Sequence, residues 1–361
     1  MKILITGGHP APALALIDEI KKYRSVEIVF VGRKHPIFGE KNYSFEYLEV
    51  KKRGIRFIEL KAGKLPRFFS WGIITNFFLF FVGFFSALKI VIWQRPTIIL
   101  SFGSFLAFPI AFWAWIFRIP LFLHEQTIAP GLANRIIGFW AKKIFLSFPQ
   151  AAKYFNQKKT IVSGNPIRFK ELTELKKSLG KKPVIYVTGG SLGSHCINLH
   201  LEKILPKLLK RYIVIHQIGN ISQHNDYYRL KNKFKTPNYI PFSHLSQEQL
   251  FEVYQKSDLV IGRAGANTFF ELIALKKPAL FIPLPYAASS EQIKHAQIFS
   301  ESGAGEIFHQ DEDSEKLLNL IDKMINNLKD YKDNLQKLQF LYQKDAAQKI
   351  IKTIFSSLKE N

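Results

Sequence analysis

The sequence contains almost no cysteine. One residue, Cys196, is present among 361, so no disulfide can form within the chain, and this composition is typical of proteins of the reducing cytoplasm. No group of cysteine and histidine residues has the spacing of zinc ligands. We therefore expect neither a structural metal nor a metal cofactor.

Acidic residues are also few, with 28 Asp and Glu against 51 Lys and Arg, which gives a formal net charge of +23. An excess of this size favours anionic partners such as nucleic acid, acidic lipid or a phosphorylated substrate. The sequence lacks a compact basic block and any known nucleic-acid-binding module, so charge alone does not choose among these partners. The first residues lack the cleavage site of a signal peptide, and we interpret them as a strand.

What the chain does contain is a regular alternation of strand-like apolar runs and helical patterns. This alternation predicts an α/β fold with parallel sheets covered by helices. The first series of expected strands is Lys2–Thr6, Val26–Val31, Arg56–Leu60, Thr97–Ser101, Pro120–His124 and Lys143–Ser147. The second series is Val184–Thr188, Tyr212–Gln217, Asp258–Ile261 and Ala279–Pro283. Because each series begins with its own glycine loop, we expect two similar domains that meet near Ser163–Pro166, with ligands beyond the carboxyl ends of the strands.

The compositional outlier is Phe68–Leu88, 21 residues without a charge, which has lysine and arginine residues on both sides. Its length suffices for a transmembrane helix, but a single span would separate the first three strands from the rest of their sheet. We therefore favour a helix that lies at the membrane interface with its basic flanks on acidic headgroups. A buried core helix and an inserted hairpin or span are the alternatives. The residues expected to contact lipid are Trp71, Phe77, Phe80, Phe81 and Phe84.

The first glycine loop, Thr6–His9, resembles the start of a dinucleotide-binding loop, but the later glycines of that pattern are absent. The second strand also ends without an acid that would bind a ribose, so nicotinamide chemistry is disfavoured. Gly7 and Gly8 let backbone N–H groups approach an anion at a helix start. His9 then projects from the end of its strand, either as a general base near neutral pH or as a simple helix cap.

Further polar motifs follow other expected strands. The run His124–Gln126 comes directly after an apolar strand, an arrangement that favours a site over packing. Gly189–Ser194 is a glycine-rich turn that is able to hold a pyrophosphate at a helix start. In Gly262–Glu271, an arginine is available for anionic charge, and a glutamate lies where it would bind a ribose. Gln292 is suited to bind sugar hydroxyls.

Taken in order, these motifs resemble those of the MurG family, the transferases that complete the lipid-linked precursor of peptidoglycan. The resemblance rests on Thr-Gly-Gly-His, His-Glu-Gln, Gly-Asn-Pro-Ile-Arg at Gly164–Arg168, Gly-Gly-Ser, the Arg263–Glu271 run, and Pro-Tyr-Ala-Ala with a later glutamine. It spans nearly the whole chain, and the ordered set is far more specific than any one motif.

The resemblance implies a GT-B fold, in which two Rossmann-like domains face each other across a cleft. It assigns 1–163 to an acceptor domain, 164–339 to a UDP-sugar donor domain, and a last helix at about 340–361 to the first domain. It implies an inverting, metal-independent transfer of N-acetylglucosamine from UDP-N-acetylglucosamine to the C4 hydroxyl of the muramoyl sugar of undecaprenyl-linked lipid I, forming lipid II. It further implies a peripheral protein on the cytoplasmic face of the plasma membrane, with anionic lipid and other cell-wall synthesis enzymes as partners and no nucleic acid.

Carried over position by position, the resemblance assigns three groups of site residues. The expected catalytic residues are His9, as general base, and Glu125. Those expected on the acceptor side are Thr6, Gly7, Gly8, His124, Gln126 and Asn134. Those expected on the donor side are Arg168, Gly190, Ser191, Arg263, Ala266, Asn267, Thr268, Glu271 and Gln292.

Two other functions are compatible with these residues. One is a lipid-directed UDP-sugar transferase with another acceptor, which is motivated by the altered first loop, where Leu4 and Ile5 stand in place of the glycine pair common in the family. The other is a non-catalytic scaffold that binds UDP-sugar or lipid. The presence of His9, Glu271 and Gln292 together argues against the scaffold.

Overall fold

The computed structural model describes residues 1–35, 43–60, 73–167, 182–190, 192–219, 224–285 and 290–359, with the backbone alone for 73–80 and 359. The chain divides into two compact units. The first unit comprises Met1–Arg168 and Gln343–Asn361, and the second comprises Phe169–Tyr342. The boundary expected from the sequence, between residues 163 and 164, lies a few residues earlier.

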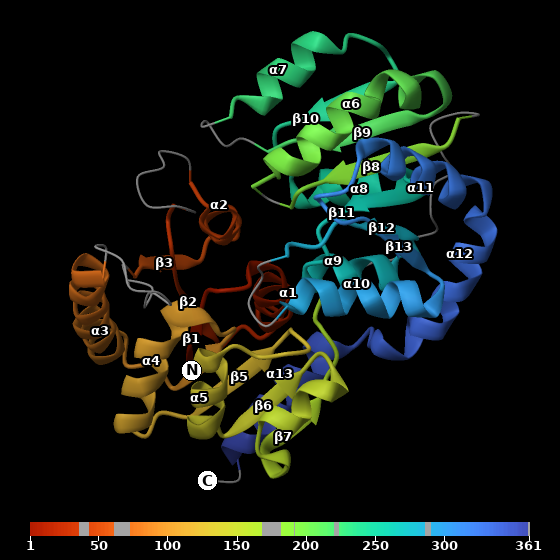
Figure 1. Ribbon diagram of the computed structural model, residues 1–361. Coiled ribbons are helices and arrows are strands. Elements are labelled where there is room, and N and C mark those ends of the chain that lie inside the picture. The colour runs from red at the N-terminus through yellow and green to blue at the C-terminus, as the bar shows by residue number, and fades with distance from the viewer. Residues whose placement is uncertain are drawn as a thin grey trace. The chain divides into compact units, whose positions relative to one another are not determined.

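In the described part of the chain, the first unit is built on a seven-stranded parallel sheet in the order β3-β2-β1-β4-β5-β6-β7 (Figure 1). Its strands are β1 Lys2–Thr6, β2 Glu27–Gly32, β3 Arg56–Glu59, β4 Ile98–Ser101, β5 Leu121–Glu125, β6 Lys143–Leu146 and β7 Thr160–Val162. Its α-helices are α1 Pro10–Ile20, α2 Phe45–Lys52, α3 Ile73–Gln94, α4 Ser104–Ile116, α5 Leu132–Trp140 and α13 Ala346–Lys359. The strand order reverses between β1 and β4.

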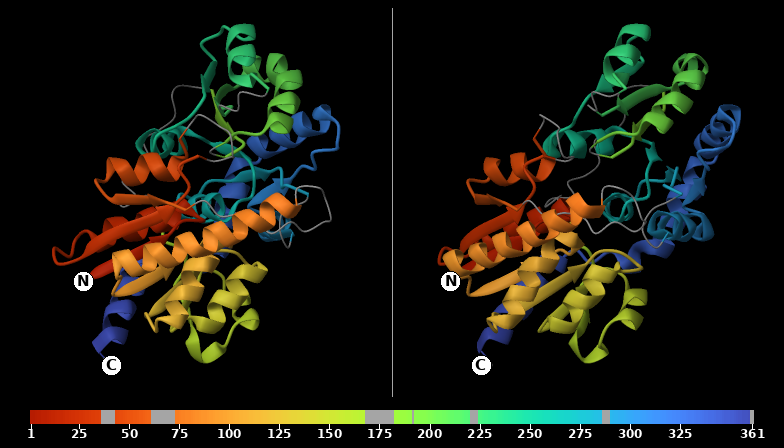
Figure 2. Two further views of the ribbon diagram at one scale, coloured as in Figure 1. Left: turned by 90° about the vertical axis from the view of Figure 1, so that its left-hand side faces the viewer. Right: turned by 60° about the vertical axis from the view of Figure 1, so that its left-hand side comes forward.

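Helices cover both faces of this sheet because the strands carry apolar side chains on both sides. Leu4 and Leu123 pack with α3, α4 and α5, whereas Ile3 and Phe122 pack with α1, α2 and α13. Both views of Figure 2 show α3 (orange) lying alongside the strands of the first sheet. α13 comes from the far end of the sequence and packs against α1. Full burial of each such side chain stabilises the unit by roughly 1.5–3 kcal/mol.

The described residues of the second unit form a six-stranded parallel sheet in the order β10-β9-β8-β11-β12-β13. Its strands are β8 Val184–Thr188, β9 Ile213–Gln217, β10 Tyr239–Phe242, β11 Leu259–Gly262, β12 Ala279–Phe281 and β13 Gly305–Ile307. Its α-helices are α6 His195–Arg211, α7 Asp226–Lys233, α8 Gln247–Lys256, α9 Ala266–Ala274, α10 Glu291–Ser302, α11 Ser314–Asn326 and α12 Leu328–Asn334. Here the strand order reverses between β8 and β11.

Every strand that the sequence predicts is present, with ends that differ by at most two residues. The structure adds three strands, β7, β10 and β13, that were not predicted. β7 and β13 have only three residues each, too few to produce a clear apolar pattern. β10 contains Pro241, which is tolerated because β10 is an edge strand.

The uncharged stretch forms α3, which begins and ends five to six residues later than the expected helix Phe68–Leu88. Within the described ranges, no helix combines the length and the hydrophobicity that crossing a membrane requires. Phe81 is exposed on α3. Trp71 and the side chains of Phe77 and Phe80 lie outside the described residues.

Phe84 faces α4 rather than the surface where lipid was expected. Its backbone carbonyl accepts a hydrogen bond from Trp113 Nε1 at 2.9 Å. Its ring lies 4.9 Å from the ring of Phe112, measured between centroids. Because nearly every position of α3 is apolar, no periodic signal in the sequence distinguishes the packed side of the helix from the exposed one.

Candidate active site

The carboxyl ends of β1 and β4 lie side by side where the strand order of the first sheet reverses. At such a point the loops that follow the two strands lead to opposite faces of the sheet and leave room for a ligand. The loop Gly7–His9 leads directly into α1, and Phe102–Gly103 leads into α4. The two helix N-termini, each with unpaired backbone N–H groups, therefore lie close together, and this arrangement favours the binding of an anion.

These two loops approach each other closely because both contain glycine. Gly8 has a φ of +151°, and a Cβ at its position would lie 2.6 Å from the carbonyl oxygen of Gly103. Gly103 has a φ of +76°, and a Cβ there would lie 2.2 Å from the amide nitrogen of the Asn134 side chain. A larger residue fits at neither position unless the backbone moves. The fold thus brings the predicted acceptor-side residues Gly8 and Asn134 to one site, with Thr6 buried at the end of β1.

His9 occupies the N-cap position of α1, but its side chain makes no capping hydrogen bond. Its Nδ1 lies 3.4 Å from the carbonyl oxygen of Phe102 and 2.5 Å from the side-chain nitrogen of Gln126. Oxygen and nitrogen of a glutamine amide are assigned from the hydrogen-bond network, and Gln126 Oε1 has no other partner among the described residues. We therefore assign Oε1 to this contact, so that Nδ1–H donates to Gln126 and Phe102 and the lone pair lies on Nε2.

The environment of His9 favours the neutral ring. Burial lowers the pKa of His9 below its ordinary value of 6.5, and the hydrogen bond to the Phe102 carbonyl opposes this shift. A neutral imidazole with Nε2 unprotonated at pH 7 is able to accept a proton. The geometry therefore favours the general-base interpretation of His9 over the helix-cap interpretation.

The carboxylate of Glu125 is fully buried and accepts three hydrogen bonds. Its Oε1 accepts from the backbone N–H and the hydroxyl of Thr127 at 2.8 and 2.7 Å, and its Oε2 accepts from Asn134 Nδ2 at 2.6 Å. Burial raises the pKa of Glu125, whereas these donors lower it. Both oxygens are thus engaged within the protein, although the sequence placed Glu125 among the catalytic residues.

His124 is also fully buried. Burial lowers the pKa of His124 to about 4, so the ring is neutral at physiological pH. Its ring packs against Phe102 with centroids 5.5 Å apart, and its Nε2 lies 3.5 Å from the hydroxyl of Ser147. His124 therefore contributes to the packing beneath the site rather than to its surface.

The second sheet has an equivalent arrangement where β8 and β11 are neighbours. The loop after β8 ends at Ser194, whose hydroxyl caps α6 by accepting from the backbone N–H of Ile197 at 3.5 Å. The loop after β11 ends at Gly265, the N-cap of α9, which has no side-chain cap. Gly190 lies in the first of these loops, and its carbonyl accepts from Gln217 Nε2 at 3.3 Å. Two helix N-termini again begin next to each other, as a diphosphate site requires.

Arg263 follows β11, but its guanidinium is bonded inside the unit. Its Nη1 donates to the carbonyl of Ile282 at 2.8 Å, and its Nη2 donates to Ser194 Oγ at 2.8 Å and to Gln310 Oε1 at 3.2 Å. Burial lowers the pKa of Arg263. The sequence predicted that Arg263 binds the donor directly, whereas its observed partners include the serine that caps α6. Its charge adds to the positive end of the α6 dipole.

The other predicted donor residues gather around α9 and α10. Glu271 is buried and accepts from the hydroxyl of Tyr254 at 3.3 Å. Asn267 lies in the first turn of α9, and its buried Oδ1 has no hydrogen-bond partner among the described residues. Gln292 Oε1 accepts from the backbone N–H of Leu284 at 3.1 Å. Two further predicted residues share the first turn of α9, Ala266 and Thr268, and two lie outside the described residues, Arg168 and Ser191.

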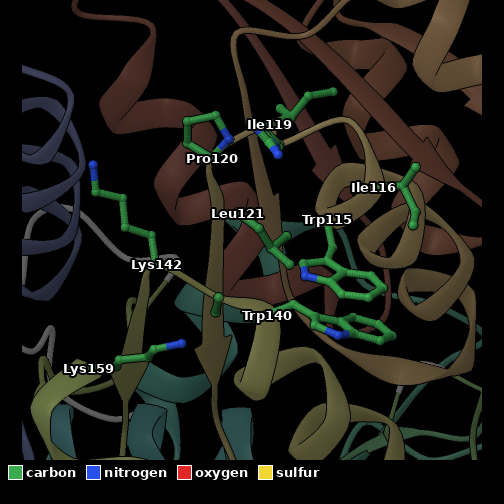
Figure 3. Close-up of a pocket in the computed structure, with 10 residues that line it drawn as sticks. Trp115, Ile116, Ile119, Pro120, Leu121, Trp140, Lys142 and Lys159 are labelled. Atoms are coloured by element: carbon green, nitrogen blue, oxygen red, sulfur yellow. The ribbon is translucent and has the colours of Figure 1, made fainter. Parts of the chain in front are cut away.

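A pocket of about 680 Å³ lies at the amino ends of the strands of the first sheet, opposite the candidate active site, where β5 and β6 begin (Figure 3). The rings of Trp115 and Trp140 stack in its wall, with centroids 5.5 Å apart and planes inclined by 14°. Its lining also contains three cationic residues, Arg118, Lys142 and Lys159. Figure 3 shows the two tryptophans on one side of the pocket and the two lysines on the other.

Further aromatic residues are exposed on α3 and α5, the two helices that pack against α4. The penultimate residues of α3, α4 and α5 are Trp93, Trp115 and Phe139, and their side chains are 75%, 50% and 80% exposed. Phe85 is exposed on the same helix as Trp93. We call these four residues, together with Trp140, the aromatic surface. Phe85, Trp93 and Phe139 were not among the residues predicted to contact lipid, although Trp93 close to Arg95 has the composition of a membrane-interface helix end.

Comparison with known proteins gives matches along nearly the whole chain. The glycosyltransferase family 28 N-terminal domain matches residues 6–146, and the glycosyltransferase family 28 C-terminal domain matches residues 184–354. The chain is 34% identical to the UDP-N-acetylglucosamine–N-acetylmuramyl-(pentapeptide) pyrophosphoryl-undecaprenol N-acetylglucosamine transferase of Clostridium tetani, over 94% of each chain. It is 33% identical to the enzyme of the same name, numbered 2, of Bacillus cereus, over 99% of each chain.

Solved structures share the fold at lower identity. Acinetobacter baumannii MurG superposes with a TM-score of 0.69 at 21% identity, covering 98% of this chain and 99% of that chain. The UDP-GlcNAc 2-epimerase of Neisseria meningitidis, bound to UDP-GlcNAc, superposes with a TM-score of 0.68 at 15% identity, covering 99% and 100%. The predicted GT-B fold is therefore confirmed.

Proposed function

The chain belongs to glycosyltransferase family 28 and within it to the MurG family, and on this premise we propose that it transfers N-acetylglucosamine from UDP-N-acetylglucosamine to the C4 hydroxyl of the muramoyl sugar of lipid I, forming lipid II. The observation that carries the proposal is His9. It is a neutral imidazole at the carboxyl end of β1, with its Nδ1 engaged and its Nε2 available, beside the N-termini of α1 and α4.

On the acceptor side, the N-termini of α1 and α4 bind the pyrophosphate of the lipid, and Gly7 and Gly8 let the backbone come close to it. His9 Nε2 accepts the proton of the C4 hydroxyl as its oxygen attacks the anomeric carbon of the donor sugar. The bond between that carbon and the UDP oxygen breaks, and UDP leaves with the electron pair. Attack opposite the leaving group inverts the configuration at the anomeric carbon.

On the donor side, the N-termini of α6 and α9 stabilise the diphosphate of UDP as its charge develops. Gly190 belongs to the loop before α6, and Ala266, Asn267 and Thr268 to the first turn of α9. Ser191, the next residue in the sequence after Gly190, is proposed as a further donor contact. Arg168 supplies a positive charge in addition to that of Arg263. Glu271 binds the ribose, and Gln292 binds the transferred sugar. Since the helix termini and arginines supply the positive charge, we propose that transfer needs no metal ion.

We also propose that the protein docks on the cytoplasmic face of the plasma membrane as a peripheral protein. The aromatic surface presents tryptophan rings at three helix ends, as side chains that partition into the headgroup region do. Arg118, Lys142 and Lys159 lie beside two of these rings, where they would pair with anionic headgroups at about 1 kcal/mol each. Cell-wall synthesis enzymes that use the same lipid are proposed as neighbours there.

The decisive experiment supplies the purified protein with labelled UDP-N-acetylglucosamine and a lipid I analogue, with and without EDTA. We expect a disaccharide-lipid product in both conditions. If the protein transfers the sugar only to a different lipid, that lipid replaces lipid I as the proposed acceptor. UDP binding without transfer to any acceptor would favour a scaffold, and loss of product with EDTA would contradict the metal-independent step.

A further inference from the structure

We infer that Glu125 is a positioning residue that holds the N-terminus of α4 in place through Asn134 and exchanges no proton with the substrate. This inference rests on the proposed function, because it explains how the acceptor side of that site keeps its shape. The family resemblance pointed to Glu125 as a catalytic group, and a catalytic role and a positioning role make opposite predictions.

The first observation is that Glu125 has no free oxygen. The residue is 0% exposed, and the two hydrogen bonds from Thr127 occupy Oε1, while the bond from Asn134 occupies Oε2. Thr127 belongs to the same loop as Gln126, the partner of His9. Glu125 therefore fixes the loop that orients His9 without reaching the surface on which a substrate would lie.

The second observation is the polarity of the link to α4. Asn134 donates from Nδ2 to Glu125 and accepts at Oδ1 from the backbone N–H of Ser104, at 3.1 Å. An amide has one donor end and one acceptor end, so the carboxylate of Glu125 decides which end faces Ser104. If the amide turned over, two N–H groups would face each other at Ser104 and the link would be lost.

The third observation is what the link holds. Gly103 and Ser104 both have positive φ, +76° and +71°, and for a serine this conformation costs roughly 1–3 kcal/mol. Such backbone persists only where its surroundings fix it. The Gly103 carbonyl touches the Gly8 position, and the carbonyl before it, of Phe102, accepts from His9. Movement of Ser104 would therefore shift both the loop Gly7–His9, which is proposed to bind the pyrophosphate, and the imidazole of His9, the proposed general base.

The polarity of the link provides the test. In Glu125→Gln, the amide oxygen stays on the backbone N–H of Thr127, which can only donate, so the new NH₂ group faces Nδ2 of Asn134. Two donors then oppose each other, and the Asn134 amide must turn over and release Ser104. We expect kcat/KM for transfer to the lipid I analogue to fall about 10²-fold, as displacements of about 1 Å do, with UDP affinity unchanged. Asn134→Ala, which leaves Glu125 in place, is expected to cause a similar loss for the same reason.

The double variant Glu125→Gln/Asn134→Asp reverses the polarity of the link. The glutamine amide now donates to the aspartate, and the aspartate accepts from Ser104 as the asparagine did. We expect this variant to recover transfer to within about fivefold of wild type, because coupled residues show non-additive effects. Amide hydrogen exchange at Ser104 is expected to be fast in the single variants and slow again in the double variant.

Two results would overturn the inference. One is a double variant that restores slow exchange at Ser104 but not transfer, since this would mean that the carboxylate itself takes part in the reaction. The other is Asn134→Ala with near-wild-type transfer. If wild-type protein makes no product with lipid I, the proposed function fails instead, and the exchange rates at Ser104 still test the link.

Discussion

His9 differs from the buried histidine His216 in the use of its ring. His216 has both nitrogens bonded, Nδ1 to the Tyr239 hydroxyl at 3.0 Å and Nε2 to Asn198 Oδ1 at 3.1 Å, and burial lowers its pKa to about 3. Such a ring has no lone pair for a substrate. Among the described residues, His9 forms hydrogen bonds only through Nδ1. Histidine therefore serves packing at the end of β9 and chemistry at the end of β1.

This difference predicts the pH dependence of the reaction. The neutral ring of His9 is the active form, and its pKa lies below 6.5 because of burial, so kcat/KM should fall as pH decreases through a value below 6.5 and stay level above it. His9→Asn should lower kcat by about 10²–10⁴-fold and abolish the acidic limb, with UDP binding unchanged. pH–rate profiles of both proteins check this. A variant that keeps the limb would remove His9 from the mechanism, and His216→Asn is the control that should lose stability instead.

At the scale of elements, α3 shows that the hydrophobic pattern of a sequence can reveal a helix without revealing which of its sides is packed. Its strongly apolar composition was readable from the sequence, but the side that packs on α4 was not. Phe84 contacts α4, whereas Phe85, one residue later, is 59% exposed. Adjacent phenylalanines on one helix therefore serve different purposes: the first packs against α4 and the second lies on the aromatic surface.

These neighbours form a matched pair for a membrane experiment. Phe85→Ser should weaken binding to phosphatidylglycerol vesicles about tenfold, since an aromatic ring contributes roughly 1.5–3 kcal/mol when it leaves water, without changing the unfolding midpoint. Phe84→Ser should instead destabilise the unit by about 2–3 kcal/mol through lost packing. Vesicle sedimentation and urea unfolding separate the two effects. Equal vesicle binding by Phe85→Ser, Trp93→Ser and wild type would contradict membrane docking at the aromatic surface.

The site was predictable to the extent that its residues follow apolar strands. Gly8 and His9 were identified because glycine and histidine interrupt a strand-to-helix pattern, and the structure places both at the reversal of strand order. Ser104 was missed, and Ser194 was named only as the last residue of a glycine-rich turn. A serine at a helix start is common, and the partner of each lies far away in sequence, at Asn134 or Arg263. Side-chain direction was not predictable either, and for this reason Arg263 was assigned to the donor rather than to Ser194.

At the scale of the molecule, the chain leaves its first unit and later returns to it. α13 supplies Ile350 and Ile354 to the core that contains Ile3 and Leu14, although more than 300 residues separate them in sequence. The sequence of α13 alone indicates an amphipathic helix and does not name its partner. The first unit is therefore complete only when the last helix has been made.

This arrangement predicts where a core substitution will act. Ile350→Ala in α13 should cost about 2–5 kcal/mol, and the loss should appear as faster amide exchange in β1 and α1, far away in sequence, while the second unit keeps its protection. Ile321→Ala in α11 is the matched control, since Ile321 is equally buried but belongs to the core of the second unit. It should increase exchange in β8 and α6 and leave β1 protected. Exchange that rises equally in both units for either variant would show that the two units unfold together, and the division at Arg168 and Gln343 would then have no energetic meaning.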